Sequence, residues 1–496
     1  MRPCRLSVGR AALVLVLFAS LFDGSLGQSY PNATLLQLTD PEALCLDGRQ
    51  AYVYVSLAPQ PSSLWVLNFG ASPTLAFCID LKSCLATRDY MATQTPPDSY
   101  LLSGWGVQSR SCIDNPDFCN ANHVHFPIGA FSPGCDLGLM VSQYDLAVND
   151  TFSLHFRGPQ IISAALTALI DGGSGPMAGA RDILLTGVTF GGTAAVLAAD
   201  FVQPLARALL PSLQRFKVLP VDAIHPRYYS MVWMAWNNFF SDSWMTPALQ
   251  FLANVTGGPS GKPASPALRA CLAAGNGTLP LWECLYLNSS LPHVASPLFL
   301  VQQLGSVWDN QCMYEGAAPT DNLMQVQCSK SSNTYRHYYT CVQYPDLCSP
   351  FVVANFSIPL QYEYSAYANA TAMAPRSGNG TNGYFLHSCY QGVYSMSGRG
   401  GVSVWNIIAV GNFTLREAVS AWWVSEGAPG APMRHHDCYW NASGVPTAEG
   451  ADSQGGLQAY DAQGRGDGGG ELDAPIVPPW TSRYFCNPTC RGFPWY

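Results

Sequence analysis

Short apolar segments alternate with longer amphipathic ones in the first half of the chain, and this alternation constrains the fold most strongly. Residues 64–69, 123–128 and 181–186 are short and apolar, which predicts buried strands. Residues 160–170, between the last two, carry apolar residues at helical spacing. A strand, a helix and a second strand in this order favour a right-handed crossover. The sequence therefore predicts an α/β fold with a mostly parallel central sheet flanked by helices.

A glycine-rich turn follows the third predicted strand. Residues 187–192 read Gly-Val-Thr-Phe-Gly-Gly, and the Ala-rich residues 193–202 continue as a predicted helix. This order is typical of a nucleophile elbow, the sharp turn that presents a reactive hydroxyl above a sheet. Thr189 occupies the position of the nucleophile. Further along, residues 297–304 predict a core strand and residues 415–424 an amphipathic helix.

The first 27 residues have the order of a secretory signal peptide. Arginines precede an apolar stretch over residues 11–22, and small residues lead to a predicted cleavage site near Gln28. The stretch has about half of the roughly 20 residues that cross a bilayer, so a transmembrane anchor is the weaker interpretation. We expect residues 1–27 to be removed, residues 28–44 to form a lead-in, and the protein to reach the cell exterior or a cell wall without stable membrane insertion.

Cysteines and glycosylation acceptors agree with export. Of the 17 cysteines, Cys4 lies in the predicted signal peptide and the others form an even set. In an oxidising compartment such a set indicates disulfides, worth about 2–4 kcal/mol each. Asn-x-Ser/Thr acceptors indicate N-linked glycans on the surface. They begin at Asn32, Asn149, Asn254, Asn276, Asn288, Asn355, Asn369, Asn379, Asn412 and Asn441.

The composition indicates a large hydrophobic core and argues against a nucleic-acid partner. Hydrophobic residues make up 48% and charged residues 11% of the chain, which is enough to fill a large core. A net charge of −8 without any Lys/Arg run argues against nucleic-acid binding. We expect one domain over residues 45–496, with a flexible insertion at residues 443–479, which are rich in Gly, Asp, Gln and Pro.

Several motifs occur in the order and with the cysteine spacing of one family. They are Cys45-Leu-Asp-Gly48, Cys78-x5-Cys84 with Arg88, Asn-Pro-Asp-Phe at 115–118, Phe-Arg-Gly at 156–158, Pro-Leu-Phe at 297–299, Ser388-Cys389 and Cys486-Asn-Pro-Thr-Cys490. Over roughly residues 45–490 the chain resembles the pectin acetylesterase/Notum family of carboxylesterases. The resemblance implies a disulfide-stabilised α/β-hydrolase fold and no cofactor. Together, the resemblance and the closeness of the cysteines in sequence imply four local disulfides. These are Cys78–Cys84, Cys112–Cys119, Cys271–Cys284 and Cys486–Cys490.

The resemblance implies a Ser-Asp-His triad whose members are all replaced here. At the elbow, Thr189 replaces the family's serine. Its β-branch suits a strained turn poorly and crowds the path of attack. The family aspartate falls on Ser306, and Asp309 could substitute only if the loop were shifted. The family histidine, shortly after Ser388-Cys389, falls on Gly392.

Other histidines do not restore the base. His387 stands at a different place in the motif, and His435 and His436 are too far along the chain to be matched. The pair His123-x-His125 would lie on one strand face, but no third ligand has convincing spacing, so we expect no metal site.

The remaining candidates concern the oxyanion and the pocket. Gly70 is the glycine that survives from the family's oxyanion segment, and the backbone amide of Phe190 follows the nucleophile position. Asp222 and Arg157 match family positions beside the pocket, although buried hydrogen bonds and ion pairs are their more common role. His225 lies close to Asp222 in sequence, but the order fits no hydrolase triad.

Two functional hypotheses compete. In the first, the chain is a secreted pseudo-esterase with near-zero turnover that binds an extracellular polysaccharide or an acylated ligand in the inherited pocket. In the second, it is an active carboxylic ester hydrolase that removes O-acetyl groups from a pectin-like wall polysaccharide, with Thr189 as nucleophile. A structural matrix glycoprotein is a third, less specific interpretation.

Overall fold

The computed structural model describes the core of the chain in several stretches. These are residues 32–70, 77–102, 104, 106–129, 134–225, 245–258, 262–306, 382–391, 398–399, 402–425 and 434–436. The predicted signal peptide, the insertion at 443–479, Asp309, Gly392 and the expected Cys486–Cys490 bridge lie outside these residues. The side chain of Ser306 also lies outside what the structure describes.

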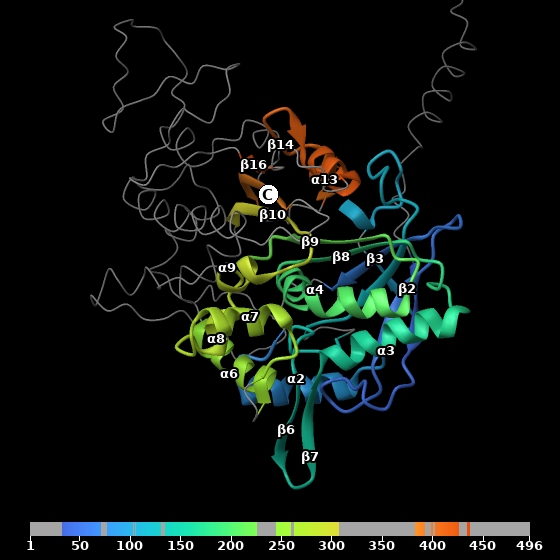
Figure 1. Ribbon diagram of the computed structural model, residues 1–496. Coiled ribbons are helices and arrows are strands. Elements are labelled where there is room, and N and C mark those ends of the chain that lie inside the picture. Colours follow the sequence, from blue (N-terminus) through green and yellow to red (C-terminus); the bar gives the residue numbers. More distant parts are fainter. Residues whose placement is uncertain are drawn as a thin grey trace, which may run out of the picture.

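A ten-stranded sheet forms the centre of the fold (Figure 1). Its spatial order is β16-β11-β10-β9-β8-β3-β5-β2-β1-β4. In that order the strands are β16 (Arg434–His436), β11 (Gly383–Gln391), β10 (Phe299–Ser306), β9 (Arg215–Val221), β8 (Asp182–Val188), β3 (Leu64–Phe69), β5 (Asn122–Phe126), β2 (Tyr52–Ser56), β1 (Asn32–Gln37) and β4 (Ser99–Leu101). Strands from β16 to β5 pair in parallel, and β2, β1 and β4 are added antiparallel. The predicted mostly parallel sheet is confirmed.

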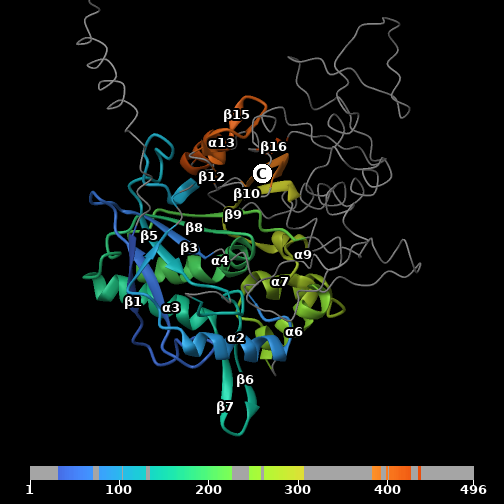
Figure 2. The ribbon, with the colours of Figure 1, turned by 180° about the vertical axis from the view of Figure 1, so that it is seen from behind.

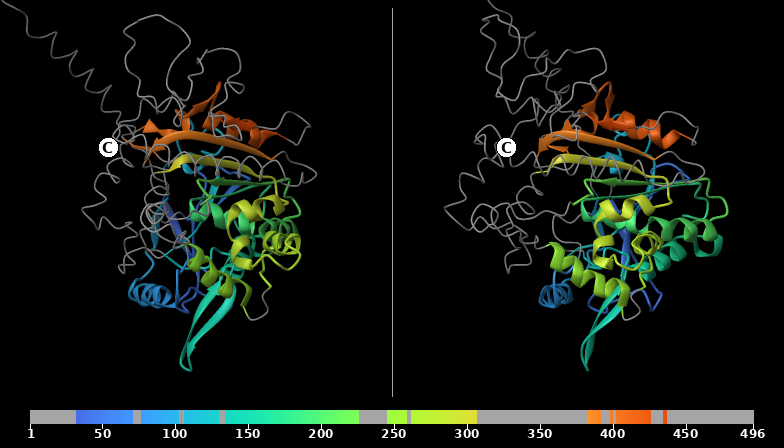
Figure 3. Two further views of the ribbon diagram at one scale, coloured as in Figure 1. Left: turned by 90° about the vertical axis from the view of Figure 1, so that its left-hand side faces the viewer. Right: turned by 60° about the vertical axis from the view of Figure 1, so that its left-hand side comes forward.

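Helices cover both faces of this sheet, as Figures 1 and 3 show. The helices are α2 (Leu81–Thr93), α3 (Gly158–Ile170), α4 (Phe190–Leu209), α6 (Met245–Gly257), α7 (Pro266–Ala274), α8 (Leu281–Cys284), α9 (Leu287–Ser290) and α13 (Leu415–Val424). Smaller strand pairs are β6 (Gln143–Asn149) with β7 (Phe152–Arg157), β12 (Gly398–Arg399) with β13 (Val402–Ser403), and β14 (Ala409–Val410) with β15 (Phe413–Thr414). Among the described residues, no helix is both long and apolar enough to cross a bilayer.

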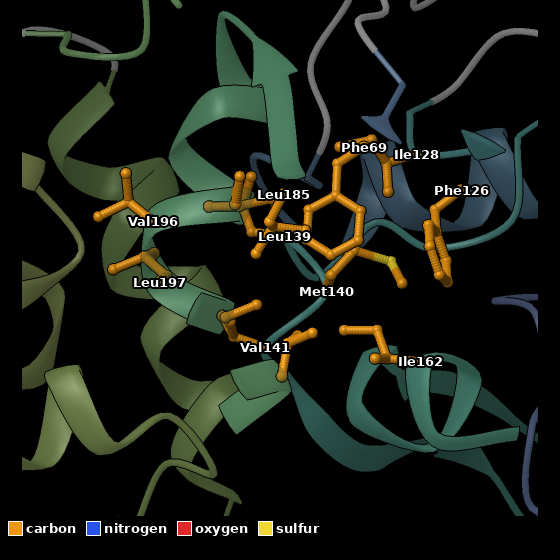
Figure 4. Close-up of a cluster of buried hydrophobic side chains, with 14 of the residues drawn as sticks. Phe69, Phe126, Ile128, Leu139, Met140, Val141, Ile162, Leu185, Val196 and Leu197 are labelled. Carbon is orange, nitrogen blue, oxygen red and sulfur yellow. The ribbon is translucent and has the colours of Figure 1, made fainter. Parts of the chain in front are cut away.

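Alternating side chains of the central strands fill two hydrophobic cores. On β8, Ile183 and Leu185 belong to the core shared with α3 and α4, whereas Leu184 belongs to the core shared with α13. Successive residues of a strand point to opposite faces, so a sheet covered on both sides needs apolar residues at every position. Figure 4 shows Ile162 of α3 and Val196 of α4 in the first of these cores.

Four disulfides join described residues. Cys78–Cys84, Cys112–Cys119 and Cys271–Cys284 confirm three of the expected local pairs. The fourth, Cys45–Cys135, spans 90 residues and was not among the predicted pairs. It ties the segment before β2 to the loop that precedes the β6–β7 hairpin.

Candidate functional site

The elbow lies between β8 and α4, where the sequence predicted it. Thr189 has φ 53° and ψ −126°, a conformation that β-branched residues adopt rarely and at a cost. Its N–H donates to Val221 O at 2.8 Å, and its own carbonyl accepts from Thr193 N at 3.0 Å. The strained backbone of a nucleophile elbow is therefore present, although the residue at its apex is a threonine.

Three glycines hold this turn tightly between its neighbours. A Cβ on Gly187 would stand 2.3 Å from the carbonyl carbon and oxygen of Gly191, and one on Gly191 would stand 2.4 Å from Phe69 O. A Cβ on Gly192 would meet Ala223 Cβ at 2.7 Å. Real Cβ atoms do not approach backbone this closely, so the glycine pattern is required by the contacts of β8, α4 and β3.

The hydroxyl of Thr189 has no proton acceptor among the described residues. The residue is 8% exposed, and its Oγ1 is buried without a hydrogen bond to any residue that the structure describes. A hydroxyl nucleophile needs a general base within about 2.6–3.2 Å to take its proton. The nucleophile position is thus built as a turn but lacks an activating partner in the described part of the chain.

The positions of the acid and the base belong to the strands beyond β9. Ser306 ends β10 and pairs in register with Gln391, the last residue of β11 and the neighbour of Gly392. The carboxyl ends of β8, β10 and β11 thus lie along one edge of the sheet, as a triad would require. Ser306 carries no carboxylate and Gly392 no imidazole.

His387 lies within β11, four residues before that strand ends. It pairs in register with Gln303 of β10 and is fully buried. Burial lowers the pKa of its imidazole to about 3, so the ring stays neutral at physiological pH. His435 lies on β16, where it pairs in register with Phe385 of β11.

Asp222 links the ends of adjacent strands. Asp222 is buried and has φ 47°. Its N–H donates to Val301 O at 2.8 Å, and its Oδ1 accepts from Gln303 N at 2.8 Å. The Gln303 side chain in turn donates to Cys389 O at 2.9 Å. These bonds join β9, β10 and β11, which is the structural role that the sequence favoured for Asp222.

Arg157 lies away from the elbow, at the base of the β6–β7 hairpin. Its guanidinium bonds Asp145 at 2.5 and 2.8 Å and Glu42 at 2.8 Å. The hydrogen bonds to Asp145 raise the pKa of Arg157. These bonds hold its side chain against β6 and Glu42, and its place beside the pocket stays a prediction.

Gly70 follows β3 directly and contacts β5. Its N–H donates to Phe126 O at 2.9 Å, so this amide is already engaged. A Cβ at this position would stand 2.8 Å from Cε1 of His125, whose ring accepts from Asn68 Nδ2 at 2.9 Å and stacks on Tyr100. Burial lowers the pKa of His125 to about 4. The surviving glycine is explained by this close approach of an imidazole, a contact that the sequence pattern did not reveal.

A small apolar cavity lies beside the elbow. Phe190 and Thr193, from the first turn of α4, line it together with His225, whose ring centroid is 4.3 Å from that of Phe190. The other lining residues are Phe77, Leu139, Ala223, Met245, Leu249, Leu285, Tyr286 and Leu287. Its volume is about 20 Å³, room for about one or two water molecules. Neither Asp222 nor Arg157 lines it.

Potential metal ligands do not cluster in the described part of the chain. No group of three or more His, Cys, Asp or Glu side chains in that part of the chain lies together as a metal site would require. Both ring nitrogens of His123 are buried and make no hydrogen bond to a described residue. The cavity instead offers apolar walls with a histidine and a threonine at the side nearest the elbow.

A parallel sheet with an elbow at the carboxyl end of a central strand defines the α/β-hydrolases. The family model for pectinacetylesterase matches residues 27–444. The chain belongs to the pectinacetylesterase family.

Known relatives agree with this assignment. The human palmitoleoyl-protein carboxylesterase NOTUM is 24% identical over 314 residues, which cover 59% of this chain and 55% of the relative. The chain thus spans about half the length of that curated relative. Two crystal forms of the Wnt deacylase Notum from Drosophila share the fold, each with a TM-score of 0.52. Crystal form II is 18% identical, and the match covers 79% of this chain and 93% of that chain. Crystal form I is 17% identical, and the match covers 83% of this chain and 100% of that chain.

Proposed function

We propose that this chain is a secreted member of the pectinacetylesterase family that binds an acylated or polysaccharide ligand at the elbow and has almost no esterase turnover. The observation that carries the proposal is the buried Thr189 hydroxyl, which makes no hydrogen bond to a described residue. Losing a triad member leaves about 10³–10⁴-fold acceleration over water, supplied by the oxyanion hole and by binding. Further losses add little, because the triad acts as a unit.

Export is the second part of the proposal. Four disulfides among the described residues, a predicted signal peptide and many glycosylation acceptors support it. The cavity suggests an apolar ligand group, because its walls are mainly Phe, Leu and Met side chains; its volume of about 20 Å³ admits only the end of an acyl chain. NOTUM is named as a palmitoleoyl-protein carboxylesterase, and the family model as pectinacetylesterase, so both a fatty acyl group and an acetylated polysaccharide are reasonable probes.

Esterase assays test the catalytic part. For the secreted protein with p-nitrophenyl acetate and with acetylated pectin, we expect wild type and Thr189→Ala to differ by less than about twofold. We expect Thr189→Ser to gain less than about tenfold, because a restored serine still lacks a base and an orienting acid. A clear wild-type rate that disappears in Thr189→Ala would show that the chain is an active esterase.

One observation favours that alternative. The elbow keeps a strained positive φ at Thr189, and strained backbone persists at functional sites more often than elsewhere. In this second reading Thr189 is the nucleophile, with an aspartate and a histidine from positions other than those of the family. The same pair of variants decides between the two functions.

Ligand binding has its own measurement. A ligand that binds only the native state raises the apparent melting temperature, because it adds RT ln(1 + [L]/Kd) to stability. At 100 times Kd we expect a gain of about 2.7 kcal/mol with palmitoleate or with an acetylated pectin oligosaccharide. Leu249→Phe, whose ring adds about the volume of the cavity, is expected to abolish the shift with palmitoleate. If neither probe raises the melting temperature of the wild type, the binding proposal is wrong.

A further inference from the structure

Two exposed leucines lie at the antiparallel end of the sheet. Figure 2 shows strand β1 at this end. β4 is the last strand in the sheet order and pairs only with β1 among the described strands. Leu101, at the end of β4, is 63% exposed, and Leu57, just beyond β2, is 56% exposed. An open sheet edge with apolar side chains is a template for pairing with another chain unless something covers it.

Asn32 lies at the same end of the sheet as these two leucines. β1 and β4 pair in register as Asn32↔Leu101. β1 and β2 pair from Thr34↔Val55 to Gln37↔Tyr52, and Leu57 follows the last residue of β2. Cross-strand neighbours point to the same face, with Cβ atoms about 5 Å apart. The side chain of Asn32 is therefore a neighbour of Leu101, and Leu57 lies at the same end of the adjoining strand β2.

Asn32 begins an acceptor motif for N-linked glycans. Asn32-Ala-Thr34 has the sequence Asn-x-Thr, and the strand alternation exposes Asn32 and Thr34 while it buries Ala33. We propose that Asn32 carries an N-glycan that covers Leu57 and Leu101 and protects this sheet edge from self-association. In the modification the Asn32 amide nitrogen loses a proton and bonds the anomeric carbon of a lipid-pyrophosphate-linked oligosaccharide, and the lipid pyrophosphate leaves.

We choose a glycan as the cover because its attachment site, Asn32, lies next to the exposed leucines. Of the six exposed large hydrophobic side chains in the described residues, one is paired with Asn32 and a second follows the end of the adjoining strand. Asn149 offers the contrast. It is an exposed acceptor at the end of β6, next to the turn of the β6–β7 hairpin, and its Oδ1 accepts from Thr151 N at 2.8 Å, with no exposed leucine paired to it.

Peptide mapping and light scattering test this proposal, which rests on the export that the proposed function includes. From a eukaryotic secretory host, Asn32→Gln and Thr34→Val should each lose one glycan. Each should also raise the fraction of dimers and larger species at least about twofold in size-exclusion chromatography with light scattering. Adding Leu57→Lys and Leu101→Lys to Asn32→Gln should return the protein to monomer.

Asn149→Gln is the matched control, because it should lose one glycan without self-association. If Asn149 is glycosylated and Asn32 is not, the proposal fails although export stands. If the wild type does not reach the medium of that host, export itself fails. Asn32→Gln could be retained in the cell. In that case, secretion of the variant that also carries Leu57→Lys and Leu101→Lys supports the proposal. Retention of that variant as well overturns it. Equal monomer fractions in Asn32→Gln and Asn149→Gln also overturn it.

Discussion

Replacing both Cys45 and Cys135 by alanine is expected to lower the free energy of unfolding by about 4.5 kcal/mol. The bridge joins residues 90 apart in sequence, so its loss releases a long loop in the unfolded chain. Both cysteines are buried, and Leu46 N donates to Cys135 O at 3.0 Å, so the folded segments keep other contacts when the bridge is gone. Urea unfolding followed by tryptophan fluorescence measures the loss.

The double replacement of Cys78 and Cys84 is the control. That bridge spans only 6 residues, and the same loop-closure relation gives about 2 kcal/mol. Its cysteines are also buried, so the two pairs differ mainly in loop length. Equal losses for the two pairs would mean that loop closure is not what the long bridge contributes.

The elements whose pattern is local could be predicted from the sequence. The strand expected at 181–186 is Asp182–Val188, and the helix expected at 160–170 is Gly158–Ile170. The helix expected at 415–424 has those bounds, because Thr414 and Glu417 form a capping box at its start. The elbow was predictable because its glycines follow a strand directly and precede a helix.

Contacts between distant segments could not be predicted in this way. The Cys45–Cys135 bridge depends on how residues 90 apart meet, and proximity in sequence favoured only the short pairs. The sequence matched Gly70 to an oxyanion segment, but it did not show that the ring of His125, from the neighbouring strand β5, leaves no room for a Cβ at this position. Gln303, whose buried side chain donates to Cys389 O of β11, belongs to a residue type that is usually exposed.

The conformation of Thr189 shows how tertiary contacts override a local preference. A β-branched residue disfavours positive φ, which was the argument against a working elbow. The turn is nevertheless held by the Val221 carbonyl and by the close packing of Gly187 and Gly191. The loss of activity that we propose therefore depends on the lack of a proton acceptor in the described part of the chain, and not on a collapsed turn.

Acidification from pH 7 to pH 5 is expected to cost the protein about 4 kcal/mol of stability. Burial lowers the pKa of His123 to about 3, of His125 to about 4 and of His387 to about 3, from an ordinary value of 6.5. The folded state keeps these rings neutral, whereas the unfolded chain takes up protons below pH 6.5. Their contribution is complete above pH 6.5 and is lost as the pH falls toward the folded pKa values, by about 2 kcal/mol per ring at pH 5.

Asp136 opposes this loss. Burial raises its pKa to about 6 from 3.8, so between these values the folded state holds a proton that the unfolded chain has released. Its contribution therefore grows as the pH falls, by about 1.4 kcal/mol between pH 7 and pH 5. The three histidines outweigh it, and the net direction is destabilisation by acid.

His123→Leu isolates one histidine from this balance. Neither ring nitrogen of His123 makes a hydrogen bond to a described residue, so an apolar side chain leaves no such partner unsatisfied. Its charged form would also face the guanidinium of Arg110, which adds to the lowering of its pKa. We expect the variant to be about 2 kcal/mol less sensitive than wild type to the change from pH 7 to pH 5 in urea unfolding. An identical acid loss in both proteins would show that His123 is protonated in the folded state or released from burial before unfolding.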